Sequence, residues 1–199
     1  VNEQMASTLL LYLHGFNSSP KSVKAQQMED YLSLHHPDIT IEIPNLSPYP
    51  QDAWLQIEQL ISAYPAHQLG VVGSSLGGYY ATKVNQQFHC PAVIINPAVK
   101  PYELLVDYLG ENTNPYTQVK FNLAQQHIDE LRALDCSELV HPETIWALLQ
   151  TDDEVLDYNQ ATTKYEMARL TVEQGGDHAF IGFERYLSDI LTFLAFKPM

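Results

Sequence analysis

Two kinds of hydrophobic pattern alternate along the chain. Short apolar runs rich in β-branched residues are typical of strands, and between them apolar residues recur every three or four positions, as on a helix. The short runs predict six strands, at residues 9–13, 39–43, 69–73, 92–96, 144–150 and 168–173. Because these runs are apolar almost throughout, they indicate a parallel sheet that is buried on both faces.

The helical segments complete this pattern. Ser19 and Pro20 can cap and begin a first helix, whose apolar face comprises Ala25, Met28 and Leu32. The apolar faces of the second and last helices comprise Trp54, Ile57 and Ile61, and Phe183, Tyr186, Leu187, Ile190, Leu191 and Leu194. Strands that alternate with helices predict an α/β fold, with a mostly parallel, doubly wound sheet and helices on both faces.

The alternation breaks between residues 98 and 142, where no strong strand pattern occurs and only residues 123–134 have a helical one. We interpret this segment as a small helical cap inserted over the functional site. With 199 residues, of which 45% are hydrophobic and 17% charged, the chain has the size and apolar content of one domain. We therefore predict a single domain over residues 1–199, with the cap at 98–142.

Charge and composition exclude several classes of function. A net charge of −14 repels polyanions, so we expect no nucleic-acid partner and no anionic membrane surface. The chain has no run of 18 apolar residues and no basic flank followed by an apolar stretch, which predicts no membrane insertion and a cytoplasmic location. Cys90 and Cys136 lack the spacing of zinc ligands, so we expect them to serve packing and expect no metal.

The candidate nucleophile is Ser75, in the sequence Leu-Gly-Val-Val-Gly-Ser-Ser-Leu-Gly-Gly at residues 69–78. Here a predicted strand enters a G-x-S-x-G motif and then a helix, the arrangement that exposes a serine on a strained turn. Gly73 and Gly77 supply the two positions at which such a turn leaves no room for a side chain. The alternative is a glycine-rich turn that only lets the helix pack closely on the sheet.

A second motif, Tyr-Leu-His-Gly-Phe-Asn at residues 12–17, places His-Gly at the end of the first strand. In α/β-hydrolases the loop after this strand supplies one backbone N–H to the oxyanion hole, and the residue after the nucleophile supplies the other. These donors would be the N–H groups of Phe16 and Leu76. We expect His14 itself to be a structural residue that bonds this loop.

The candidate base and acid lie in the loops after the last two strands. His178 follows Gly175 and Gly176, whose flexibility allows the loop to reach back over the sheet edge. The acidic loop after residues 144–150 contains Asp152 and Asp153, of which we assign the orienting role to Asp153, although such a loop can also be a cap or a solvated turn. The order Ser75, Asp153, His178 is that of the α/β-hydrolases.

At this point the chain resembles the YqiA-like esterases, small bacterial members of the α/β-hydrolase superfamily. The resemblance runs from Thr8 to Leu194, through the blocks YLHGFNSSP at 12–20, GSSLGGYYAT at 73–82, NPAV at 96–99, DYLGEN at 107–112, DEVLDY at 153–158 and HAF at 178–180. It implies an α/β-hydrolase fold and esterase activity on short acyl esters, with acyl-CoA thioesters as a second class and no cofactor. It carries Ser75, Asp153 and His178 over as the triad, and it favours Asp153 because we expect glycine at position 152 in relatives.

These observations predict a serine esterase that hydrolyses small carboxylic esters through an acyl-enzyme on Ser75. A thioesterase acting on acyl-CoA is one alternative, and it needs cations for the phosphates, for which Lys21, Lys24 and Lys100 are candidates. The other alternative is a binding protein that keeps the fold and performs no turnover, because fold does not imply function. We expect a small-molecule ester as partner, and the sequence does not indicate the oligomeric state.

Overall fold

The computed structural model describes residues 7–65 and 67–196, which contain a six-stranded parallel sheet in the order β2-β1-β3-β4-β7-β8. The outermost residues of the predicted domain, 1–6 and 197–199, lie outside the described part. The strands are β1 (Thr8–Leu13), β2 (Ile39–Glu42), β3 (Gln68–Ser74), β4 (Ala92–Ile95), β7 (Ile145–Gln150) and β8 (Arg169–Glu173). Each lies within one residue of its predicted bounds, so the predicted sheet is confirmed.

The strand order reverses direction between β1 and β3. The chain passes from β1 outward to β2, returns to β3 on the other side of β1, and then continues outward through β4, β7 and β8. Leu13 at the end of β1 pairs with Gly73 near the end of β3, so the loops that follow both strands leave the sheet side by side. Such a reversal point is where open α/β sheets hold their ligands.

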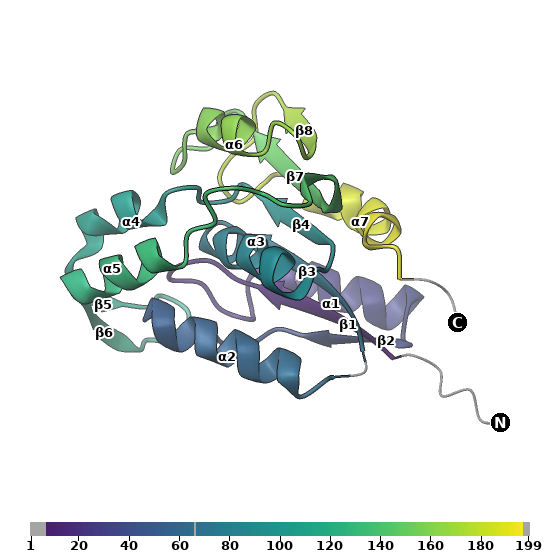
Figure 1. Cartoon of the computed structure of the whole chain (residues 1–199), viewed down its shortest axis with the longest axis horizontal. Coiled ribbons are helices and arrows are strands. Elements are labelled where there is room, and N and C mark those ends of the chain that lie inside the picture. Colours follow the sequence, from purple (N-terminus) through teal and green to yellow (C-terminus); the bar gives the residue numbers. More distant parts are fainter. Residues whose placement is uncertain (1–6, 66, 197–199) are drawn as a thin grey trace.

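The two faces of the sheet form two hydrophobic cores. Because alternate side chains of a strand point to opposite faces, Leu11 and Leu13 pack in one core and Leu10 and Tyr12 in the other. Helices α2 (Pro50–Ser62), α3 (Leu76–Phe88) and α6 (Tyr158–Lys164) cover the first face, and α1 (Val23–His35) and α7 (Leu187–Leu194) cover the second (Figure 1). The short 3-10 helix η3 (Phe183–Tyr186) leads into α7.

The predicted start of the first helix is wrong by three residues. Helix α1 begins at Val23, and Ser19 does not cap it. Instead, the Ser19 hydroxyl accepts a hydrogen bond from the N–H of Lys21 (3.0 Å), and the N–H of Ser22 donates to the Ser19 carbonyl (3.1 Å). These bonds close a separate turn around Pro20, because a serine side chain can satisfy a nearby backbone N–H in a turn as well as at a helix start.

The segment between β4 and β7 contains more than the expected helix. Its elements are α4 (Pro101–Leu104), η1 (Leu105–Tyr108), β5 (Gly110–Thr113), β6 (Lys120–Leu123), α5 (Gln125–Ala133) and η2 (Pro142–Thr144). The antiparallel pair β5–β6 was not predicted, because β5 is a run of polar residues and β6 has only two buried apolar side chains, Phe121 and Leu123. Figure 1 shows this pair with α4 and α5 at the end of the molecule toward which the strands of the sheet point.

Within the described ranges, we find no helix with the length and hydropathy that crossing a bilayer demands.

Candidate active site

Ser75 occupies a sharp turn between the end of β3 and the start of α3. Its backbone has φ 57° and ψ −120°, a conformation that is rare for a residue with a side chain. The turn is possible only because its neighbours are small: a Cβ on Gly73 would collide with the carbonyl of Gly77, and one on Gly77 with the carbonyl of Leu13. Both glycines are therefore required by the close approach of α3 to β3 and β1, as the motif predicted.

The structure brings Ser75, His178 and Asp153 into one line of hydrogen bonds. The Nε2 atom of His178 lies 3.0 Å from Ser75 Oγ, and its Nδ1 atom lies 3.0 and 2.9 Å from the two carboxylate oxygens of Asp153. A carboxylate can only accept, so Nδ1 carries a proton and Nε2 is free to accept one from the serine. This arrangement can activate the hydroxyl as a nucleophile.

The two neighbouring aspartates have different surroundings. The side chain of Asp153 is 2% exposed, and its Oδ1 atom also accepts hydrogen bonds from the N–H groups of Val155 and Leu156, both 2.9 Å long. Asp152 is exposed, and its carboxylate accepts a long hydrogen bond of 3.4 Å from the hydroxyl of Thr151. The orientation of the carboxylate that faces His178 is therefore determined by the backbone of its own loop.

Glu154, to which the sequence assigned no role, and Lys24, which it offered only as a cation for phosphates, also hold the histidine loop. The carboxylate of Glu154 accepts a hydrogen bond from the N–H of His178 (2.9 Å), and the ammonium group of Lys24 donates to the carbonyl of Ala179 (2.8 Å). Burial lowers the pKa of Lys24, while the charges of Asp177 and Asp153 act in the opposite direction. The position of Glu154 directly after Asp153 was the available signal for its role.

The predicted oxyanion donors, Phe16 and Leu76, both border a cavity with Ser75 and His178. Among the described residues, neither backbone N–H has an acceptor in the protein. Leu76 is the first residue of α3, where helix geometry leaves N–H groups free and the helix dipole favours negative charge. Both donors are therefore available to a ligand next to Ser75.

His14 bonds the loop after β1, as expected. Its Nε2 atom accepts a hydrogen bond from the N–H of Leu46 (3.0 Å), so the proton is on Nδ1, which donates to the carbonyl of Gly15 (2.8 Å). Burial lowers the pKa of His14, partly offset by the bond to the Gly15 carbonyl. His14 thus holds the peptide next to Phe16 in place as a neutral side chain.

An apolar cavity of about 190 Å³ lies over Ser75 and His178 on the side of the inserted segment. Pro101, Leu104, Leu105 and Tyr108 line it, at the spacing that places residues on one face of a helical segment. Tyr102 does not border this cavity, because its ring stacks against the guanidinium of Arg132 on α5. The helical spacing directs residue 102 away from the face that 101, 104, 105 and 108 share.

A second, larger cavity of about 530 Å³ opens on the other side of the same two residues, toward α1. Its lining includes Lys24 and the acidic residues Glu154, Asp177 and Glu184. Ser75 and His178 line both cavities. A molecule whose reacting bond lies at Ser75 would therefore extend one part into each cavity.

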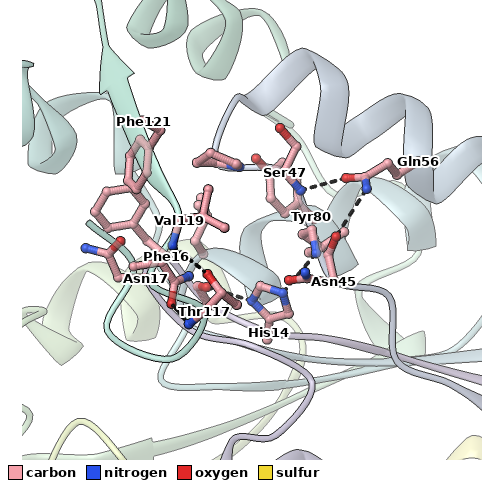
Figure 2. A pocket seen from close by; sticks show the side chains of 15 residues that line it. His14, Phe16, Asn17, Asn45, Ser47, Gln56, Tyr80, Thr117, Val119 and Phe121 are labelled. Atoms are coloured by element: carbon pink, nitrogen blue, oxygen red, sulfur yellow. Dashed lines mark hydrogen bonds between the residues drawn. The ribbon is translucent and has the colours of Figure 1, made fainter. Parts of the chain in front are cut away.

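A third cavity, of about 140 Å³, lies behind the loop after β1 and does not include Ser75. Figure 2 shows Phe16 beside Phe121, with Gln56 hydrogen-bonded to the N–H of Ser47 and the carbonyl of Asn45. The ring of Phe16 lies edge-on to those of Tyr108 (5.3 Å between centroids) and Phe121 (5.8 Å). Phe16 therefore separates this cavity from the apolar cavity over Ser75.

In the part of the chain that the structure describes, no three His, Cys, Asp or Glu residues are grouped so that they could hold a metal ion.

Comparison with known proteins identifies a matching family and similar folds. A family model described as "Uncharacterised protein family (UPF0227)" matches residues 9–195. Among solved structures, the chain is similar to Est1E from Butyrivibrio proteoclasticus, with 12% identity, a TM-score of 0.71, and coverage of 97% of this chain and 89% of that one. It is also similar to the alpha/beta hydrolase domain-containing protein 10 from mouse, with 16% identity, a TM-score of 0.68, and coverage of 94% and 90%.

A third similar structure is the esterase domain of a Rhodothermus marinus protein, with 16% identity, a TM-score of 0.68, and coverage of 98% of this chain and 88% of that one. At these identities the likeness establishes the fold, which is that of the α/β-hydrolases. The predicted fold class is therefore confirmed.

Proposed function

Because this chain belongs to the Uncharacterised protein family (UPF0227) and aligns Ser75, His178 and Asp153 in one line of hydrogen bonds, we propose that it is a serine esterase. Its membership of the family agrees with the resemblance to the YqiA-like esterases. The observation that carries the proposal is the unbroken line of hydrogen bonds from the buried carboxylate to the serine hydroxyl. The expected substrates are small carboxylic esters.

The reaction follows from the positions of these groups. His178 Nε2 takes the proton of Ser75 as Oγ attacks the acyl carbonyl carbon, and the carbonyl oxygen becomes an oxyanion that accepts hydrogen bonds from the N–H groups of Phe16 and Leu76. His178 then gives the proton to the departing alkoxide, and an alcohol and an acyl-serine result. His178 next deprotonates a water molecule that attacks the acyl carbon, and it returns this proton to Ser75 Oγ as the acyl–Oγ bond breaks and the carboxylic acid leaves. Asp153 stabilises the imidazolium in both steps.

The two cavities support an assignment of the two parts of the ester. The apolar cavity of about 190 Å³ suits a short acyl chain, and the larger cavity with its charged and polar lining suits the alcohol. The acyl-CoA alternative is less well supported, because acidic side chains outnumber Lys24 in the lining of the alcohol side. The acidic groups of Glu154, Asp177 and Glu184 border the same cavity and would repel the phosphates of CoA.

The proposal is tested by a fluorophosphonate and a substrate series. The reagent should label the protein on Ser75, and p-nitrophenyl esters of graded chain length should be hydrolysed, with short chains preferred over long ones. Butyryl-CoA, measured beside p-nitrophenyl butyrate, separates the ester from the thioester activity at a constant acyl group. A protein that is neither labelled nor active on any of these substrates would be a binding protein with a hydrolase fold.

The inserted segment provides a separate prediction about the acyl group. Tyr108→Ala should enlarge the apolar cavity and raise kcat/KM for hexanoate and octanoate esters relative to acetate, because its ring lines the wall next to Ser75. The measurement is kcat/KM across the p-nitrophenyl ester series. Val106→Ala is the control, since Val106 belongs to the same 3-10 turn, is 45% exposed and does not line this cavity. Equal losses on all esters in Tyr108→Ala would contradict the assignment of this cavity to the acyl chain.

A further inference from the structure

The loop that carries His178, residues 174–182, forms no helix or strand. Its backbone N–H and carbonyl groups therefore lack the partners that regular structure supplies, and buried groups of this kind need other hydrogen bonds. Besides Glu154 and Lys24, two buried amide side chains from the sheet supply them. These are Asn96, which directly follows β4, and Gln150, the last residue of β7.

Asn96 is 3% exposed, and its side chain joins three segments. Its Nδ2 group donates to the carbonyls of Asp177 (3.0 Å) and His178 (3.1 Å), and its Oδ1 atom accepts from the N–H of Gln150 (3.0 Å). Its own N–H donates to the carbonyl of Leu148 (2.9 Å), so the residue is anchored to β7. The backbone has φ 39°, in the left-handed region that asparagine tolerates better than most residues.

Gln150, also 3% exposed, holds the same loop at two further points. Its Oε1 atom accepts from the N–H groups of Asp177 (3.1 Å) and Ile181 (2.9 Å). Its Nε2 group donates to the Ile181 carbonyl (2.8 Å) and to the carboxylate of Glu173 (2.9 Å). All the hydrogen-bonding positions of this amide are thus occupied.

The orientation of the Gln150 amide is itself determined by charge. Hydrogen bonds from Arg185 hold the pKa of Glu173 at about 2, although partial burial opposes this shift. The carboxylate is therefore ionised at neutral pH and can only accept hydrogen bonds. It thereby directs Nε2 toward itself and leaves Oε1 for the histidine loop.

We propose that Asn96 and Gln150 are positioning residues that hold the imidazole of His178 between Ser75 and Asp153, an inference that rests on the proposed esterase function. Gln150 lies three residues before Asp153 and is bonded to Asn96, so the acid loop and the histidine loop share one buried anchor. Misplacement of a catalytic group by 1 Å costs about 100-fold in rate.

The test is Asn96→Gly, because glycine accepts a positive φ and the substitution removes the amide together with a single methylene group. We expect kcat on p-nitrophenyl butyrate to fall by about 100-fold and KM to change little, since neither substrate cavity is lined by Asn96. Gln150→Met removes the second amide at similar length and should give the same split between kcat and KM. The control is Asn85→Ala, which removes an equally buried amide that donates to the Cys90 carbonyl and the Thr144 hydroxyl, remote from the histidine loop.

Repeating Asn96→Gly in a His178→Ala background separates positioning from a general structural role. If Asn96 acts through the imidazole, its loss should not reduce the residual activity of His178→Ala any further. A further loss of similar size, full kcat in both single variants, or failure of both to fold would overturn the proposal. If His178→Ala itself kept wild-type activity, the proposed esterase function would be wrong. This result does not depend on Asn96, so it distinguishes failure of the proposed function from failure of the positioning proposal.

Discussion

Ser75→Ala is expected to abolish ester hydrolysis while the protein keeps its fold. The hydroxyl is the atom that attacks the acyl carbon, and loss of a serine nucleophile of this type lowers kcat by about a millionfold. The side chain is only partly buried, and its Oγ atom has His178 as its single hydrogen-bond partner among the described residues, so its removal should cost little stability. The measurements are kcat on p-nitrophenyl butyrate and the circular dichroism spectrum and melting temperature of the variant.

Ser74→Ala is the matched control for this experiment. Ser74 is the preceding residue, at the end of β3, and also borders the larger cavity, but its hydroxyl does not contact His178 among the described residues. We expect Ser74→Ala to react with a fluorophosphonate as the wild type does and Ser75→Ala to be inert. Activity of more than a few per cent in Ser75→Ala would show that another group is the nucleophile.

Asp153→Asn is expected to cause the second largest loss, a fall in kcat of about ten-thousandfold. The carboxylate of Asp153 accepts the Nδ1 proton of His178 and stabilises the imidazolium that forms in each step. An amide keeps the size of the side chain but can present its NH₂ group to the ring, which favours the wrong tautomer. The measurement is kcat on p-nitrophenyl butyrate under conditions in which the variant is folded.

Asp152→Asn is the control, because it makes the same chemical change one residue away on an exposed side chain. Its kcat should stay within about tenfold of the wild type, since Asp152 makes no contact with His178 and surface substitutions of this kind are generally mild. The reverse pattern would assign the orienting role to Asp152. Two mild variants would direct the search to another acid near the histidine.

Much of the fold could be predicted because it follows from local pattern. The six strands are mostly apolar runs and the last helix is a periodic segment, so their own side chains indicate that they are buried. The pair β5–β6 was missed because β5 is polar throughout and the pair contributes only Phe121 and Leu123 to the buried apolar residues. The start of α1 was placed too early because Ser19 and Pro20 suit a turn as well as a helix start.

For the candidate site, the sequence by itself determined residue types and chain order: a serine on a glycine-flanked turn, an acidic loop and a histidine loop after successive strands. Only the tertiary structure decided which side chains meet. Ser75 and His178 are 103 residues apart and come together because β3 and the loops after β7 and β8 reach the same edge of the sheet. It likewise distinguished Asp153 from Asp152 and Tyr108 from Tyr102, and it revealed Asn96 and Gln150. The physical reason is that the hydrophobic pattern around a residue indicates whether its side chain is buried, whereas the partners of that side chain depend on strand order, register and loop direction.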